Sequence, residues 1–145
     1  MNQAAQDEYL AGQVLTAAPQ KLQLLLVEGA LRFAQQARRD WQQEQYETAG
    51  EALLRAQEIV AQLMAGASVD QQSELARRAR GVYLFIYRSL VTAHLGRDEQ
   101  SLNDALKILD LERETWRAVC EKLGSGGAPV FDLPDMSSMG LSLQA

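Results

Sequence analysis

Val14-Leu15-Thr16-Ala17-Ala18-Pro19-Gln20-Lys21-Leu22 is the stretch that decides the fold, because it opens a long apolar helix. The fixed φ of Pro19 suits the first turn of a helix, where its missing N–H would have no partner. No further proline occurs before Pro129, so the sequence allows a run of long helices. We predict a first long helix over about residues 19–41, which spans roughly 33 Å at 1.5 Å per residue.

This helix carries two apolar faces, whereas a helix that flanks a single core needs only one. The first face consists of Leu22, Leu25, Leu26, Gly29, Phe33 and Ala37. The second consists of Leu24, Val27, Leu31 and Ala34. The pattern therefore indicates either a central helix or a helix that keeps one face for a partner.

Three further helices are predicted from the 3.6-residue periodicity. The segment 46–64 has one narrow apolar stripe. The segment 71–95 has a core face and a second apolar side formed by Leu84, Tyr87 and Val91, and the segment 100–123 has a core stripe that ends near Val119. Loops of about four to eight residues favour antiparallel neighbours. We therefore predict an all-α fold, an antiparallel up-and-down four-helix bundle with a short N-terminal cap helix.

The chain divides into three predicted parts. Residues 1–13 form an N-terminal cap segment, either a frayed terminus or a detachable cap over an apolar groove. Residues 14–123 form the four-helix bundle. Residues 124–145 form a flexible C-terminal tail, because glycines and Pro129 make its first residues a poor helix.

Composition excludes several classes of function. The 145 residues include 19 acidic and 14 basic side chains, and a net charge of −5 is poorly suited to binding nucleic acid. No apolar run approaches the roughly 20 residues that span a bilayer, and the start of the chain lacks the features of a secretory signal. Together with a single cysteine, these features predict a cytoplasmic protein with no membrane or nucleic-acid partner.

The sequence offers no catalytic, metal or cofactor site. His94 is the one histidine, and Cys120 has no second histidine or cysteine to pair with. The one basic cluster lies in the segment 77–97, where Arg77, Arg80 and Arg88 fall near one helix face. That face is either solvated and salt-bridged or open to a partner. The remaining signal is the surplus apolar surface, which is either a second core layer or a groove for an amphipathic helix of another protein.

Four sequence patterns resemble the FliS family of flagellar secretion chaperones. The first pattern is Tyr9-Leu10-x-x-Gln13-Val14-Leu15-Thr16-Ala17-x-Pro19-x-Lys21-Leu22, followed by Glu28-Gly29-Ala30-Leu31-Arg32-Phe33. The others are Ala52-x-x-Arg55-Ala56-Gln57-x-Ile59-Val60-x-x-Leu63, Tyr83-x-x-x-Tyr87-Arg88-x-Leu90-x-x-Ala93 and Leu109-x-x-x-Arg113-x-x-Trp116. Ala18 departs from the family, which usually has a serine cap there.

The resemblance implies a non-catalytic cytoplasmic export chaperone. Such a protein binds the disordered C-terminal segment of flagellin, prevents premature polymerisation and delivers its client to the flagellar type III export gate. The surplus apolar surface would then be the flagellin-binding groove, with anchors at Leu24, Val27, Leu31, Tyr83, Tyr87 and Val91. The cap and groove rim would be Tyr9, Leu10, Val14 and Leu15.

Two further expectations follow from these assignments. If Leu24 is a groove residue, Leu24→Asp should leave the bundle folded and abolish client binding. An unfolded variant would instead identify Leu24 as core. The alternative function is a structural or scaffold bundle that self-associates, so the protein is expected to be either a monomer with an open groove or a domain-exchanged homodimer.

Overall fold

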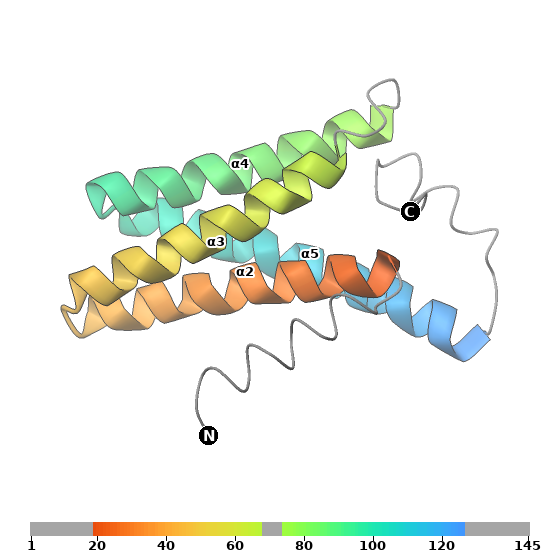
Figure 1. Cartoon of the computed structure of the whole chain (residues 1–145), viewed down its shortest axis with the longest axis horizontal. Helices are drawn as coiled ribbons and strands as arrows, with labels where there is room; N and C mark the ends of the chain where they lie inside the picture. Colours follow the sequence, from red (N-terminus) through yellow and green to blue (C-terminus); the bar gives the residue numbers. More distant parts are fainter. Residues whose placement is uncertain (1–18, 68–73, 127–145) are drawn as a thin grey trace.

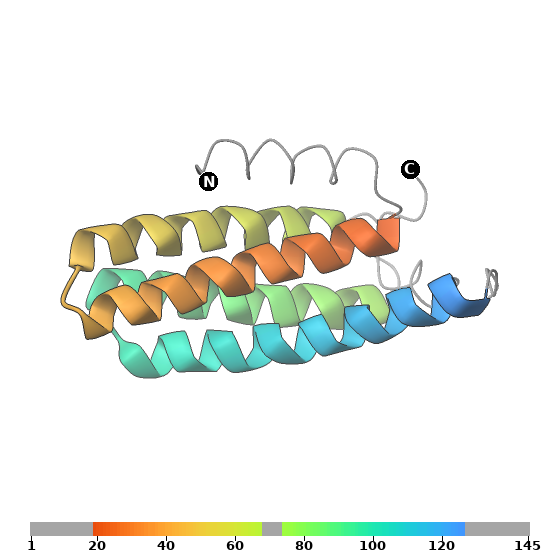
Figure 2. The same cartoon turned by 90° about the horizontal axis from the view of Figure 1, so that it is seen from below.

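A computed structural model shows four antiparallel helices, and it describes residues 19–67 and 74–126. The helices are α2 (Pro19–Gln42), α3 (Tyr46–Ala67), α4 (Glu74–Gly96) and α5 (Glu99–Gly126). Each helix packs against two others, so that α2 contacts α3 and α5, and α4 contacts α3 and α5 (Figures 1 and 2). The predicted all-α fold with four antiparallel helices is confirmed. The predicted cap helix and residues 1–13 lie outside the described residues.

The helix ends follow local chemistry. Glu44 and Arg97 adopt the left-handed conformation, with φ of 57° and 51°, in the turns after α2 and α4. Glycine usually occupies such positions after a helix, and here two long charged residues do so instead. Asp98 caps α5, because its carboxylate accepts from the Gln100 N–H at 3.1 Å and from the Ser101 hydroxyl at 2.8 Å.

Two helices extend beyond their predicted ends. The third helix was predicted to end near residue 64, but α3 continues through Gly66 to Ala67. The linker was expected to begin at Gly124, but α5 continues to Gly126. A glycine in a helix costs only about 1 kcal/mol relative to alanine, so an established helix can continue through one.

The core runs along the centre of the bundle. Its largest fully buried side chains come from every helix and include Trp116, Tyr83, Leu53, Ile86 and Leu102. On α2 the buried face is the one that contains Leu24, Val27, Leu31 and Ala34. Leu22, Leu25, Leu26 and Phe33, from the other apolar face, are only half-buried. Within the described residues, the second apolar face of α2 is therefore core.

Candidate functional site

Four of the six predicted groove anchors lie in the core. The exposed fractions are 5% for Leu24, 0% for Val27, 4% for Leu31 and 1% for Tyr83. A partner could touch these side chains only if the helices moved apart. Direct contact between these four side chains and a client therefore stays a prediction.

The other two predicted anchors, Tyr87 and Val91, are half-buried on α4. They lie with Leu84 on the side of the helix that faces α3. Two contacts between α4 and α3 identify this side. The Arg80 guanidinium donates to the Ala67 carbonyl at 3.0 Å, and Gln57 Nε2 lies 3.4 Å from His94 Nδ1.

Leu84, Tyr87 and Val91 follow one another at three- and four-residue intervals, so they form a continuous line between these two contacts. We call these three residues the α4 apolar line. It remains partly open to solvent, as a surface that receives an apolar partner must.

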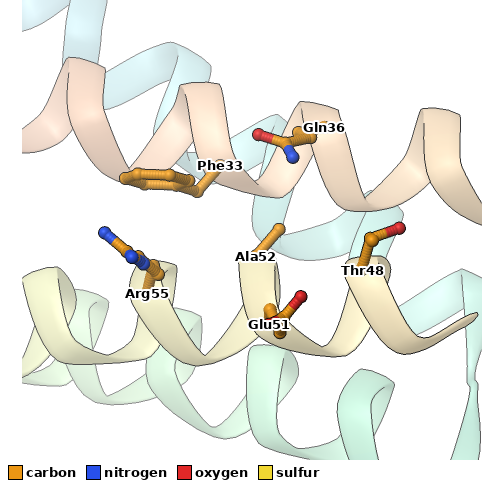
Figure 3. A pocket seen from close by; sticks show the side chains of 6 residues that line it. All are labelled: Phe33, Gln36, Thr48, Glu51, Ala52 and Arg55. Carbon is orange, nitrogen blue, oxygen red and sulfur yellow. The ribbon is translucent and has the colours of Figure 1, made fainter. Parts of the chain in front are cut away.

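A shallow pocket of about 270 Å³ lies between α2 and α3. Figure 3 shows its lining, with Phe33 facing Arg55 across the two helices. The side chains that form it are Phe33, Gln36, Thr48, Glu51, Ala52 and Arg55. We call it the Phe33 pocket. It combines an aromatic ring with both signs of charge, so it suits a side chain that has an apolar body and a polar end.

Two arginines hold the Phe33 ring in place. The guanidinium carbons of Arg32 and Arg55 lie 5.6 and 5.8 Å from the ring centroid, within the range of cation–π attraction. The sequence pattern placed Phe33 on the apolar face of α2 that contains Leu22 and Leu25, and Phe33 was not predicted to be a binding residue. The sequence signal for this pocket was Arg32 next to Phe33 in the first of the four FliS-like patterns. The contact of Arg55 with the ring could not be predicted, because it depends on how α2 and α3 pack.

Beneath these surfaces, a buried polar cluster joins α2, α4 and α5. The Gln23 side-chain amide donates to the Tyr83 hydroxyl at 2.8 Å, and Glu112 of α5 lies beside this hydroxyl. Burial raises the pKa of Glu112, and a hydrogen bond from Tyr83 offsets part of the rise. Burial, followed by the nearby Glu112 charge, raises the pKa of Tyr83. The cluster fixes the relative positions of three helices, because its members would lose their partners if one helix moved.

His94 and Cys120 have structural surroundings. His94 packs on Gly50, where a Cβ would lie 3.3 Å from the histidine Nε2. The Cys120 thiol faces the Gln20 carbonyl at 3.5 Å, and burial raises the pKa of this thiol, which makes it a poor nucleophile. In the described part of the chain, no group of histidine, cysteine, aspartate or glutamate residues could hold a metal ion.

The predicted cap and rim residues, Tyr9, Leu10, Val14 and Leu15, lie outside the described residues. None of the helices in the described ranges is long and apolar enough to cross a membrane.

Comparison with known proteins gives a consistent result. The model of the family described as "Flagellar protein FliS" matches residues 1–123. A flagellar secretion chaperone FliS from Bacillus subtilis is 30% identical over 132 residues, covering 86% of this chain and 98% of the relative. Proteins of the same description from Vibrio cholerae and Salmonella typhimurium are 25% and 29% identical, covering 79% and 75% of this chain and 84% and 82% of the relatives.

Proposed function

We infer the function from one premise, which is that this chain belongs to the FliS family of flagellar secretion chaperones. The family is non-catalytic. We propose that the chain binds the C-terminal segment of flagellin in the cytoplasm and prevents its premature polymerisation. It then delivers flagellin to the flagellar type III export apparatus by docking a component of the export gate. The observation that carries this proposal is the family match over residues 1–123, which includes nearly all of the four-helix fold.

The partly exposed surfaces of the bundle are the places where a client would gain most binding free energy. A disordered segment loses conformational entropy when it becomes ordered, so it must bury apolar area to bind. The α4 apolar line and the Phe33 pocket provide half-buried side chains that a client could cover completely. Each square ångström of apolar surface removed from water contributes about 25 cal/mol.

A few side chains should therefore provide most of the affinity. We assign the direct contacts to Tyr87, Val91 and Phe33. Leu24, Val27, Leu31 and Tyr83 would support these contacts from below, since they are buried. The proposed role of Tyr9, Leu10, Val14 and Leu15 is a cap that the client displaces.

Calorimetric titration with a peptide that covers the C-terminal segment of the host's flagellin tests the function. Circular dichroism of the same mixture should show a gain of helix together with 1:1 binding, as expected for coupled folding and binding. An absence of heat and of helix gain at high peptide concentration would overturn the proposal. If light scattering showed a stable dimer that binds no peptide, the scaffold alternative would replace it.

A matched pair of variants tests the position of the site. Val91 and Thr92 are neighbours on α4, but Val91 is half-buried on the side facing α3 whereas Thr92 is exposed. Val91→Asp should weaken flagellin binding at least tenfold, while Thr92→Asp should leave it unchanged. Equal losses in the two variants would show that the α4 apolar line is not the contact surface.

A further inference from the structure

The outer face of α4 is a second surface, separate from the α4 apolar line. It begins with the neighbours Arg77 and Arg78 and continues at three- to four-residue spacing, and all of its residues are exposed: Arg77, Arg78, Gly81, Phe85 and Arg88. We call these five residues the α4 outer face. Phe85 is 49% exposed, an unusual exposure for a large aromatic side chain in the middle of a helix.

Gly81 adds a structural feature to this face. A Cβ placed on Gly81 would have no atom within 4 Å, so no packing within the described residues requires a glycine there. Glycine is a poor residue for the interior of a helix. Since Gly81 precedes Phe85 by four residues, it leaves a shallow space directly beside the exposed ring. A chain laid along α4 could approach the backbone closely at this point.

The charges on this face are basic and mostly unpaired. Arg77 and Arg88 make no ion pair with any residue of the described ranges, and Arg78 pairs with Glu74 at 3.7 Å, with both side chains well exposed. Such an exposed pair contributes little. Arg80, which the sequence placed on the same face as Arg77 and Arg88, instead points toward α3 and donates to the Ala67 carbonyl. The face therefore suits an occupant that is both acidic and apolar.

The chain itself contains a segment of this chemistry. Val130-Phe131-Asp132-Leu133-Pro134-Asp135-Met136 has two carboxylates among large apolar side chains. Residues 127–145 contain no lysine, arginine or histidine, so nothing in them would repel the arginines. The whole chain has a net charge of −5, which disfavours phosphate-rich polymers as the occupant.

We propose that residues 130–136 dock on the α4 outer face of the same molecule. Asp132 and Asp135 would pair with the arginines, and the apolar side chains between them would cover Phe85 and the space at Gly81. The reach is sufficient, since α5 ends and α4 begins at the same end of the bundle (Figures 1 and 2). Nine residues separate Gly126 from Asp135, and an extended chain of that length spans up to about 30 Å. That exceeds the roughly 20 Å of two adjacent helices. This docking does not rest on flagellin binding.

Paramagnetic broadening in the full-length protein tests the docking. A nitroxide attached at Ser138→Cys, in a Cys120→Ser background, should broaden the amide signals of residues 78–88. The amide signals of α2, on the other side of the bundle, should keep their intensity. Docking held by exposed charges should also weaken as salt is raised from 0.1 M to 1 M, where the Debye length falls from about 10 to 3 Å.

Charge-swapped variants decide whether the contact is specific. Arg78→Glu combined with Arg88→Glu should abolish the broadening, whereas Arg39→Glu on α2, also at an exposed site, should not change it. Adding Asp132→Lys and Asp135→Lys to the double arginine variant should restore it. These changes leave the core untouched, so circular dichroism should be unaltered.

Two outcomes would overturn the proposal. The first is that residues 78–88 keep their full signal intensity in the labelled protein. The second is that isotope-labelled molecules without a nitroxide show the same broadening when they are mixed with nitroxide-labelled molecules. The occupant would then be a second copy of the chain.

Discussion

α2 and α4 have sequences of the same kind, yet of these two helices only α4 exposes large apolar side chains, namely Phe85 and Leu95. Each helix has one apolar face and further apolar residues beside it. On α2, the face with Leu24, Val27 and Leu31 is buried, and the side with Leu22, Leu25 and Leu26 is half-buried. On α4, the second apolar side remains half-buried, and Phe85 on the outer face is half exposed. Surplus apolar residues in a helix sequence therefore do not by themselves indicate a binding surface.

The residues at the helix contacts of α2 and α4 differ in size. The buried faces of α2 and α3 are rich in alanine, and a Cβ on Gly29 would lie 3.3 Å from Ile59 Cδ1. Small residues let two helices approach closely, which covers the larger side chains beside them. The buried side chains of α4 are larger and include Tyr83, Ile86 and Leu90.

The largest effect is expected when an aspartate replaces one apolar residue on each helix and the losses of stability are compared. Leu24→Asp should destabilise the protein by about 3–5 kcal/mol, because it removes a buried leucine and buries a charge. Val91→Asp should cost no more than about 1 kcal/mol, because the new carboxylate can reach water. Urea denaturation followed by circular dichroism measures both values. The structure thus reverses the expectation that Leu24→Asp leaves the bundle folded, and equal costs for the two variants would refute the contrast.

Overfilling the contact between α2 and α3 is the second test. Gly29→Leu should destabilise the protein by about 1–3 kcal/mol, because even the first added carbon meets Ile59 at close range. Gly66→Leu on α3 provides the control, since a Cβ there would meet nothing within 4 Å. Thermal denaturation of the two variants measures the difference in their stability. If Gly29→Leu were neutral, the close approach of α2 and α3 would not be what buries the face of α2.

The third test uses the buried cluster that anchors α2 and α4 to α5. The pKa of Glu112 is raised above its ordinary value of 4.5, so the folded state holds this proton more tightly than the unfolded state. Glu112 therefore favours folding most at low pH, and this contribution is lost as the pH rises through the raised pKa. Glu112→Gln removes the ionisation. The stability of the variant relative to the wild type should rise from about pH 4 to neutral pH, as measured by denaturation at several pH values. A flat difference would show that the carboxyl is not effectively buried.

The sequence predicted the helices well because each has a strong 3.6-residue pattern. The predicted starts near residues 19 and 100 lie within one residue of those observed, Pro19 and Glu99. The role of each face was harder to predict, because Leu24 and Tyr87 have similar patterns along their own helices. Their difference depends on which face of each helix its neighbours cover, and contacts between separate segments, such as Gly29 with Ile59, decide that. The Phe33 pocket could not be predicted for the same reason, since Arg55 comes from another helix.

The smallest effect is expected on the outer face of α4. Gly81→Ala should stabilise the protein by about 0.5–1 kcal/mol, because alanine is the better helix former and its methyl group meets nothing in the described structure. Gly29→Ala should gain less, since its methyl group must displace Ile59. Thermal denaturation of both variants measures the difference between the two helices.

Gly81→Ala, made in the Arg78→Glu, Arg88→Glu background, also tests the proposed docking. If residues 130–136 cover Gly81, the gain should be smaller in the full-length wild-type background than in the charge-reversed one. Equal gains would show that the methyl group is free of contacts in both, and that nothing lies over Gly81.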